Sequence, residues 1–385
     1  MERFLRTWNL KGASIAIVKD EQLVYAHGFG IADLDSNVVQ PSHLFRVASI
    51  SKLITAIGIM HLVEDKKLSL DDKVFGADAI LKYKVFDEVR DKSLYRITVR
   101  DLLAHAAGWS QRYGDPAFLP LKIAELVEDE APATMYSYYK YIASRRLTYR
   151  PGTSYSYSNM GYMFLADVIS TASGMPYEDY IRNHILIPNG IYDMHIGASF
   201  QSDKRTNEVN YWVEEENDSI PCFDGSGQLV SKANGGNHIE LLGAAGGWIC
   251  SAVELARLIT LIDAQDRVPD ILSRESIEIM TNQKRTEGPL GWKSIYSNNA
   301  WIRTGSMAGT SAAIKRMENG YTWVFISNTS MWKGSKLDRN INYLMTSILH
   351  RTKHWPEQDL FNYYFAKDDP LADFLSSFDT DKYNS

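Results

Sequence analysis

The sequence predicts an α/β fold of the α+β type, in which N- and C-terminal segments form one antiparallel sheet flanked by helices, with a mostly helical lobe inserted between them. Three observations predict it: strand-like runs occur near both ends of the chain, helical patterns fill the middle, and polar turns separate the strands. The chain has 385 residues, of which 45% are hydrophobic and 23% are charged, so it is long enough to bury a large core.

The N-terminal part of the sheet is expected to be a hairpin. Residues 14–18 and 23–26 are β-rich runs, and the polar residues 19–22 separate them. Gly28 and Gly30 follow, but a dinucleotide-binding loop would need a third glycine near position 33 and a helix that opens there. That position is Asp33, so the two glycines are interpreted as strand and turn residues.

A buried helix is expected to follow the hairpin, from Ser49 to about residue 64. It is apolar on nearly every face, which requires burial on most sides. Further helical stretches are expected at 97–106 and 161–172, and Ser251 to Glu254 is interpreted as a capping box that opens another helix. Residues 201–240 are polar and rich in Gly and Asn, and are expected to form a long surface excursion.

The C-terminal part of the sheet is predicted from three strand-like runs, at 300–304, 310–315 and 321–327. Glu318-Asn319-Gly320 lies between the last two runs and is a strong hairpin-turn signal. A final helix at about 336–352 is expected to cover the sheet.

These elements predict one domain over residues 8–352. Its α/β lobe comprises about 8–65 and 290–352, its helical lobe comprises about 66–289, and a cleft is expected between the lobes. Residues 353–385 form an acidic and aromatic C-terminal extension to which no role is assigned.

The composition argues against several classes of partner. The formal net charge is -6 and no long Lys/Arg cluster occurs, so nucleic acid is not an expected partner. No run reaches the roughly 18 apolar residues of a membrane-spanning helix, so no membrane span is expected. No signal peptide is visible, although a trimmed mature protein would also enter strand-like sequence this early.

The sequence has no histidine motif typical of metal sites and only two cysteines. The nine histidines form no His-Glu-x-x-His or similar pair, and no metal or cofactor is expected. The two cysteines, Cys222 and Cys250, are compatible with one disulfide or with two free thiols.

The start of the buried helix carries a candidate nucleophile. Ser49 and Lys52 are spaced i, i+3, so their side chains lie on one face within reach of each other. A lysine in a desolvated site can help to take the serine proton. Alternatively, Ser49 is only the N-cap of a core helix. A second Ser-x-x-Lys match, Ser330 to Lys333, leads into Gly-Ser instead of a buried helix and lacks a rigid seat.

A loop after Pro151-Gly152 supplies a second cluster, because Tyr157 and Asn159 are two residues apart and can both point into a cleft. A tyrosine near two cations has its pKa lowered from about 10 and can accept the serine proton. The alternative is that Tyr155 and Tyr157 are ordinary half-buried aromatic residues.

The predicted strand with Trp301 and Arg303 to Ser306 supplies the third cluster. Its edge can offer a backbone N–H opposite that of Ser49, and two such donors form an oxyanion hole. Gly305 has no side chain, which lets a substrate backbone approach closely. Arg303 can form a forked pair with a carboxylate; alternatively, it is a surface residue on an edge strand.

These three clusters, in this order, resemble the motifs of penicillin-recognising serine enzymes. Because the second motif is Tyr-Ser-Asn, the chain resembles the class C β-lactamases and the related D-Ala-D-Ala carboxypeptidases, D-amino-acid peptidases and esterases. Leu102 to Gly108 (LLAHAAG), Pro151 to Thr153, and Ala245 to Trp248 (AGGW) also match family motifs. The resemblance covers roughly residues 10–350 and implies a β-lactamase/transpeptidase-like fold.

The resemblance implies a role for each site residue. Ser49 is expected to be the acylated nucleophile, Lys52 its proton-transfer partner and Tyr157 the general base and then acid. Asn159 is expected to bind Lys52 and the substrate amide. The backbone N–H groups of Ser49 and Ser306 are expected to form the oxyanion hole.

The resemblance also assigns the substrate contacts of the strand. Thr304 and Arg303, beside Gly305, are expected to hold the carboxylate or acyl chain of the substrate. Arg303 departs from the lysine or histidine of the relatives, and its permanent charge can bind an anion but cannot shuttle protons.

The expected function is that of a serine acyl-hydrolase of the β-lactamase / DD-peptidase type. It would form an acyl-enzyme on Ser49 with an amide or ester, such as a cell-wall D-amino-acid peptide or a β-lactam. Two alternatives stay open: a small-ester esterase, and a catalytically silent muropeptide or penicillin-binding sensor. A periplasmic or secreted location follows from family analogy, and the oligomeric state is left open.

Overall fold

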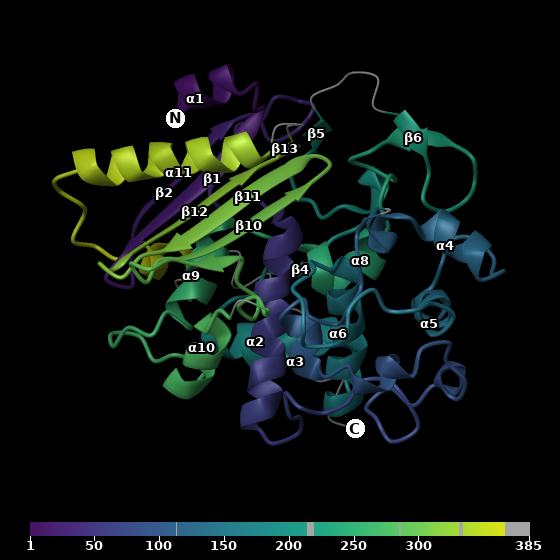
Figure 1. Ribbon diagram of the computed structural model, residues 1–385. Helices are drawn as coiled ribbons and strands as arrows, with labels where there is room; N and C mark the ends of the chain where they lie inside the picture. Colours follow the sequence, from purple (N-terminus) through teal and green to yellow (C-terminus); the bar gives the residue numbers. More distant parts are fainter. Residues whose placement is uncertain (113, 214–218, 285, 331–333, 366–385) are drawn as a thin grey trace, which may run out of the picture.

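The computed structural model describes residues 1–112, 114–213, 219–284, 286–330 and 334–365 (Figure 1). Its main feature is an antiparallel six-stranded sheet with the order β2-β1-β12-β11-β10-β9. The strands are β1 (Gly12–Lys19), β2 (Gln22–Gly30), β9 (Ser294–Ile295), β10 (Trp301–Met307), β11 (Thr310–Arg316) and β12 (Tyr321–Ser327). The two ends of the chain therefore build one sheet, and the predicted fold class is confirmed.

Pairing between β1 and β12 joins the two ends. Its register runs from Ala13 opposite Ser327 to Lys19 opposite Tyr321. The β1–β2 hairpin turns at Asp20 and Glu21, which both have positive φ, as a type I′ turn requires. Gly320 also has positive φ in the predicted turn between β11 and β12.

Both faces of the sheet are buried, which explains why its strands are almost continuously apolar. Successive side chains of a strand point to opposite faces. One face packs against helices α1 (Glu2–Thr7) and α11 (Gly334–Arg351), and the other packs against α9 (Ala252–Thr260) and the main core (Figure 1). The first face comprises Ala13, Ile15, Ile17, Trp323 and Phe325, which cluster with Leu337, Ile341 and Met345 of α11. The second comprises Ala16, Val18, Ala312, Ile314, Val324 and Ile326.

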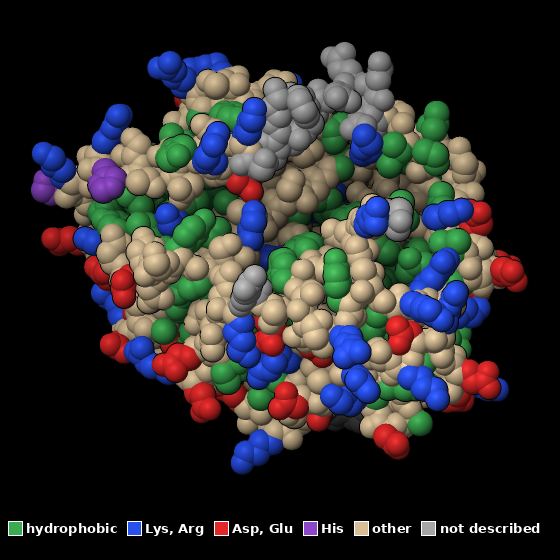
Figure 2. Space-filling model, viewed as in Figure 1, with side chains coloured by type: hydrophobic (Ala, Val, Ile, Leu, Met, Phe, Trp, Pro, Cys, Tyr) green, Lys and Arg blue, Asp and Glu red, His purple; other side chains and the backbone are tan. Residues whose placement is uncertain are grey.

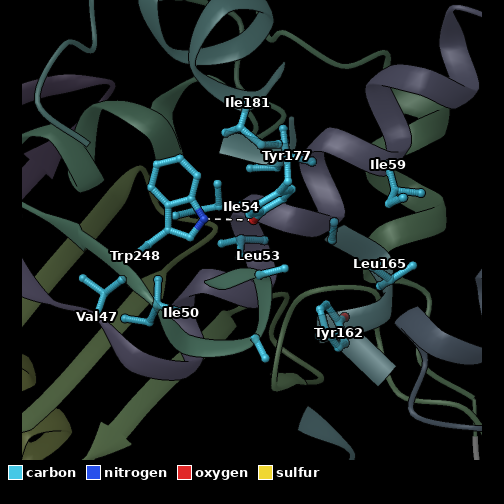
Figure 3. Close-up of a cluster of buried hydrophobic side chains, with 14 of the residues drawn as sticks. Val47, Ile50, Leu53, Ile54, Ile59, Tyr162, Leu165, Tyr177, Ile181 and Trp248 are labelled. Carbon is cyan, nitrogen blue, oxygen red and sulfur yellow. Dashed lines mark hydrogen bonds between the residues drawn. The ribbon is translucent and has the colours of Figure 1, made fainter. Parts of the chain in front are cut away.

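Helix α2 (Ser51–Glu64) is the centre of the main core. It contacts α6 (Asn159–Ser173) and α8 (Ile239–Gly246), and its burial on almost every side agrees with its apolar sequence. Figure 3 shows Leu53 and Ile54 of this helix beside Tyr177 and Trp248, whose indole Nε1 donates a 2.9 Å hydrogen bond to the Tyr177 phenol.

Shorter elements complete the fold. The other helices are α3 (Val99–Leu103), α4 (Pro120–Leu126), α5 (Met135–Ala143), α7 (Tyr177–Ile181), α10 (Arg274–Thr281) and α12 (Phe361–Tyr364). The small sheets pair β3 (Phe45–Arg46) and β4 (His195–Ile196) with β8 (Trp248–Cys250), β5 (Trp212–Val213) with β13 (Thr329–Ser330), and β6 (Ser219–Pro221) with β7 (Leu229–Ser231).

Two local expectations need correction. The helix expected to begin at Ser49 begins at Ser51, after a 3₁₀ turn over Ala48–Ile50. Ser251 caps α9 by accepting the Glu254 N–H, but the Glu254 carboxylate does not complete a capping box: it accepts the backbone N–H groups of Tyr192 and Asp193.

The region 201–240 is not only a surface excursion. Val209 and Tyr211 are buried, and the guanidinium of Arg46 lies 4.2 Å from the centre of the Tyr211 ring. Arg46 also donates hydrogen bonds to the carbonyls of Ala198 and Ala233. The segment is thus fastened to the strand that leads to Ser49, a contact that its polar composition concealed.

The C-terminal extension packs against the sheet as far as the structure describes it, to residue 365. Leu23 of β2 exchanges hydrogen bonds with the Asp359 carboxylate and the Leu360 N–H. Phe361 is buried and contacts α9. Both cysteines are buried and free, so the disulfide alternative is wrong. Among the described helices, none has the length and apolar character to cross a membrane.

Candidate active site

Ser49 lies in the 3₁₀ turn between β3 and α2, where the backbone is tightly constrained. Ala48 has a φ of 47°, a left-handed conformation that is strained for a residue with a side chain. A Cβ on Gly305 of β10 would lie 2.1 Å from the Val47 carbonyl oxygen and 3.1 Å from the Ser49 nitrogen. Gly305 is therefore required for contact with the chain's own backbone, not only for the expected approach of a substrate.

The structure brings Ser49, Lys52 and Tyr157 together from three segments. The Tyr157 phenol donates a 2.8 Å hydrogen bond to Ser49 Oγ, and Lys52 Nζ lies 3.4 Å from the same oxygen. Ser49 is not a helix cap, because α2 has no side-chain cap and the Ser49 hydroxyl binds these two groups instead. The N-cap interpretation is therefore wrong, and Tyr157, although partly exposed, makes a specific hydrogen bond to Ser49.

Lys52 is fully buried and held from two further sides. Its ammonium donates 2.5 Å hydrogen bonds to Asn159 Oδ1 and to the Ala245 carbonyl oxygen, so the expected Asn159–Lys52 contact is confirmed. Burial lowers the pKa of Lys52 to about 8, although the nearby Tyr157 favours its charged form. The amine can consequently gain or lose a proton near neutral pH.

Tyr157 has an acidic phenol. Burial by itself raises its pKa, but the positive charges of Lys52 and Arg303 outweigh burial and lower the pKa to about 8. A phenol with this pKa can accept a proton from Ser49 and return it later.

His105 positions the tyrosine loop, a role that sequence reasoning did not assign. Its Nδ1 accepts the Ser158 N–H at 3.1 Å, its carbonyl accepts the Ser156 N–H at 2.7 Å, and its ring centre is 4.4 Å from that of Tyr157. Burial and then the charge of Lys52 lower the His105 pKa well below its usual value, so the imidazole is neutral. The sequence feature that could have indicated this role is the histidine of the LLAHAAG motif.

Asp115 is a second residue that sequence reasoning missed. Its carboxylate accepts the Asn159 side-chain N–H at 2.5 Å and the Gln111 side-chain N–H at 2.6 Å, and it caps the short 3₁₀ turn Pro116–Phe118. Asp115 thereby orients the amide that binds Lys52. In a sequence, Asp-Pro indicates only a turn or the start of a helix, so the contact between Asp115 and Asn159 could not be predicted from it.

Arg303 is buried beside Ser49, with 2% of its surface exposed. Its Nε donates to the Ser49 carbonyl at 2.7 Å and its Nη2 donates to the Tyr157 phenol at 3.4 Å. The alternative of a surface arginine is wrong. The resemblance implied that the guanidinium faces a substrate carboxylate, but the guanidinium is turned towards Ser49 and Tyr157 instead.

Thr304 does not share a face of β10 with Arg303 and Gly305. Adjacent strand residues point to opposite faces, and the Thr304 hydroxyl accepts a 2.7 Å hydrogen bond from Lys293, whose ammonium lies 3.5 Å from Asp338 of α11. The expected contact of its side chain with a substrate beside Ser49 is therefore not supported by this placement.

The free edge of β10 places Ser306 suitably for an oxyanion hole. Strand β9 pairs only with Trp301 and Ile302, and the Ile302 carbonyl accepts the Lys293 N–H on that side. Backbone groups alternate in direction along a strand, so the Ser306 N–H points to the same edge where pairing has ended. At the preceding residue, Gly305, the face of β10 lies directly against the Ser49 turn.

Figure 2 shows that the surface of the molecule seen in this view is hollowed between the sheet and the helical part.

Tyr155, whose ring lies 5.7 Å from that of His105, is 47% exposed. For the second Ser-x-x-Lys match, the Ser330 hydroxyl accepts the Gly309 N–H, and Lys333 lies outside the described residues.

The chain is similar to two groups of known bacterial proteins. A family model described as Beta-lactamase matches residues 2–345. Penicillin-binding protein 4* of Bacillus subtilis is 29% identical over 198 residues, which are 49% of this chain and 39% of that protein. Protein flp of Staphylococcus aureus strain MW2 is 26% identical over 193 residues, 49% of this chain and 35% of that protein. This chain thus spans less than half the length of these relatives.

Solved structures share the fold at lower identity. The octameric penicillin-binding protein homologue from Pyrococcus abyssi has a TM-score of 0.66 at 24% identity, covering 94% of this chain and 78% of that chain. D-amino acid amidase from Ochrobactrum anthropi SV3 has a TM-score of 0.69 at 20% identity, covering 91% and 97%. D-alanine carboxypeptidase AmpC from Burkholderia cenocepacia has a TM-score of 0.65 at 17% identity, covering 89% and 96%.

Proposed function

The chain belongs to the beta-lactamase family, as its motifs predicted, and we propose that it is a serine acyl-hydrolase that forms an acyl-enzyme on Ser49. The observation that carries this proposal is the 2.8 Å contact between the Ser49 hydroxyl and a Tyr157 phenol whose pKa is about 8. An ordinary tyrosine titrates near 10 and would be a poor base at neutral pH.

The reaction has two stages. Ser49 Oγ attacks the carbonyl carbon while its proton passes to the Tyr157 phenolate, and the negative oxygen that develops receives the N–H groups of Ser49 and Ser306. Tyr157 then gives the proton to the leaving nitrogen or oxygen as its bond to carbon breaks. Water attacks the resulting ester, Tyr157 takes a proton from that water, and the acid leaves as Ser49 regains its proton. Protonated Lys52 stabilises the phenolate whenever Tyr157 has given up its proton.

The proposed substrates are amides or esters such as cell-wall D-amino-acid peptides or β-lactams, which places the proposed site of action in the periplasm or outside the cell. A small-ester esterase is the second candidate, favoured by the burial of Arg303, which was expected to hold a substrate carboxylate. A silent penicillin-binding sensor is the third, and the assembled Ser49, Lys52 and Tyr157 argue against it.

Intact-protein mass spectrometry after exposure to a fluorescent penicillin and to a p-nitrophenyl ester tests the proposal. Wild-type protein is expected to gain the mass of one acyl group and to lose it with time, whereas Ser49→Ala is expected to gain none. No adduct from either reagent would refute the acyl-enzyme. Ligand binding that is equal in Ser49→Ala and wild type, without any adduct, would support the sensor instead.

A further inference from the structure

If the protein is the serine acyl-hydrolase proposed above, the position of Arg303 indicates which class of substrate the site accepts. An arginine that binds a substrate carboxylate must present its fork to the cleft. Here the fork faces inward: Nε binds the Ser49 carbonyl, Nη2 reaches the Tyr157 phenol, and 2% of the residue is exposed. Two of the three guanidinium nitrogens are therefore bound inside the protein, and a side chain this deeply buried presents little surface to a carboxylate in the cleft.

We propose that Arg303 is an internal positioning cation for Tyr157 and the Ser49 turn, and that the enzyme therefore acts on esters or amides without needing a carboxylate beside the scissile bond. Lys293, another described cation beside β10, is engaged by Thr304 and by Asp338 on the α11 face of the sheet. The one described carboxylate hydrogen-bonded to Asn159 is that of Asp115, which would oppose a second negative charge close to that amide.

The same contacts define what Arg303 does for the reaction. Its charge is permanent, so it stabilises the Tyr157 phenolate at every working pH. Its bond to the Ser49 carbonyl fixes the turn that carries the nucleophile. Both effects are independent of the charge on the substrate, so losing Arg303 should weaken the reaction of neutral and anionic substrates equally.

Two esters of the same acyl group test whether the enzyme needs a substrate carboxylate. One has an m-carboxyphenyl leaving group and the other an m-carbamoylphenyl leaving group, so the two differ in charge but little in shape. Wild-type kcat/KM is expected to agree within about threefold between them. A preference of more than about tenfold for the carboxylate ester would overturn the inference, and this result needs no variant. Absence of any acyl adduct with either ester would instead overturn the proposed function.

Arg303→Met and Arg303→Lys test the positioning role. Arg303→Met is expected to lower kcat/KM for both esters by the same factor and to move the pH profile upward by about one to three units, because a cation beside Tyr157 is lost. Arg303→Lys is expected to move the profile back towards wild type. Far-UV circular dichroism and thermal unfolding verify that each variant folds. A loss confined to the carboxylate ester, or an unmoved pH profile in a folded Arg303→Met, would contradict the role.

Discussion

Replacing Gly305 by alanine tests the proposed oxyanion hole most directly. The new Cβ would lie 2.1 Å from the Val47 carbonyl oxygen and 3.1 Å from the Ser49 nitrogen. Carbon–oxygen contacts in proteins are ordinarily about 3.3 Å or longer. Since both of these neighbours are backbone atoms, β10 and the Ser49 turn would have to separate by about 1 Å.

This separation acts where the two N–H donors must converge. A shift of about 1 Å at a reacting centre costs about 100-fold in rate, and loss of one oxyanion donor costs about 100- to 1000-fold. We therefore expect kcat/KM of Gly305→Ala to fall by about 100- to 1000-fold, which corresponds to about 3–4 kcal/mol of transition-state stabilisation.

Stopped-flow acylation by a p-nitrophenyl ester measures the loss, and thermal unfolding confirms that the variant folds. Gly161→Ala is the matched control, because its Cβ would meet nothing closer than 3.6 Å and lies in a helix, where alanine is favoured. If folded Gly305→Ala acylates within about threefold of wild type, the donors do not act as proposed.

Three further predictions concern protons, orientation and stability. First, kcat/KM should follow a bell-shaped pH profile centred near pH 8, because the pKa values of Lys52 and Tyr157 are both about 8. In the active form the pair carries one proton, on Lys52. At lower pH the pair carries two protons, and at higher pH it carries none. A profile that is flat between pH 6 and 10 would contradict this assignment. Second, Asp115→Ala should slow acylation about tenfold, since Asn159 loses a charged partner worth about 1.5 kcal/mol; an unchanged rate would show that Asn159 needs no such support. Third, Tyr177→Phe should lower the free energy of unfolding by about 1–3 kcal/mol, because its buried phenol bridges two side chains, and urea unfolding at unchanged m-value measures the loss.

The sequence by itself determined the elements and the reactive residue types. Alternating or continuous apolar runs predicted the strands at both ends of the chain, and the all-round apolar pattern predicted that α2 is buried, because periodicity and burial are local consequences of residue order. The spacing of Ser49 and Lys52 likewise placed both side chains on one face of a turn. Tyr157 could be named, but only the motif order linked it to Ser49 across 108 residues.

The tertiary structure alone decided the direction of each contact. Whether Arg303 faces the cleft or the interior depends on how β10 lies against the Ser49 turn, and no sequence spacing encodes that angle. The Ala245 carbonyl on Lys52, the His105 and Asp115 contacts behind Tyr157 and Asn159, and the engagement of Thr304 by Lys293 are likewise long-range. Such contacts form only when distant segments pack, so the residue types were visible in the chain whereas their partners, burial and proton affinities were set by the fold.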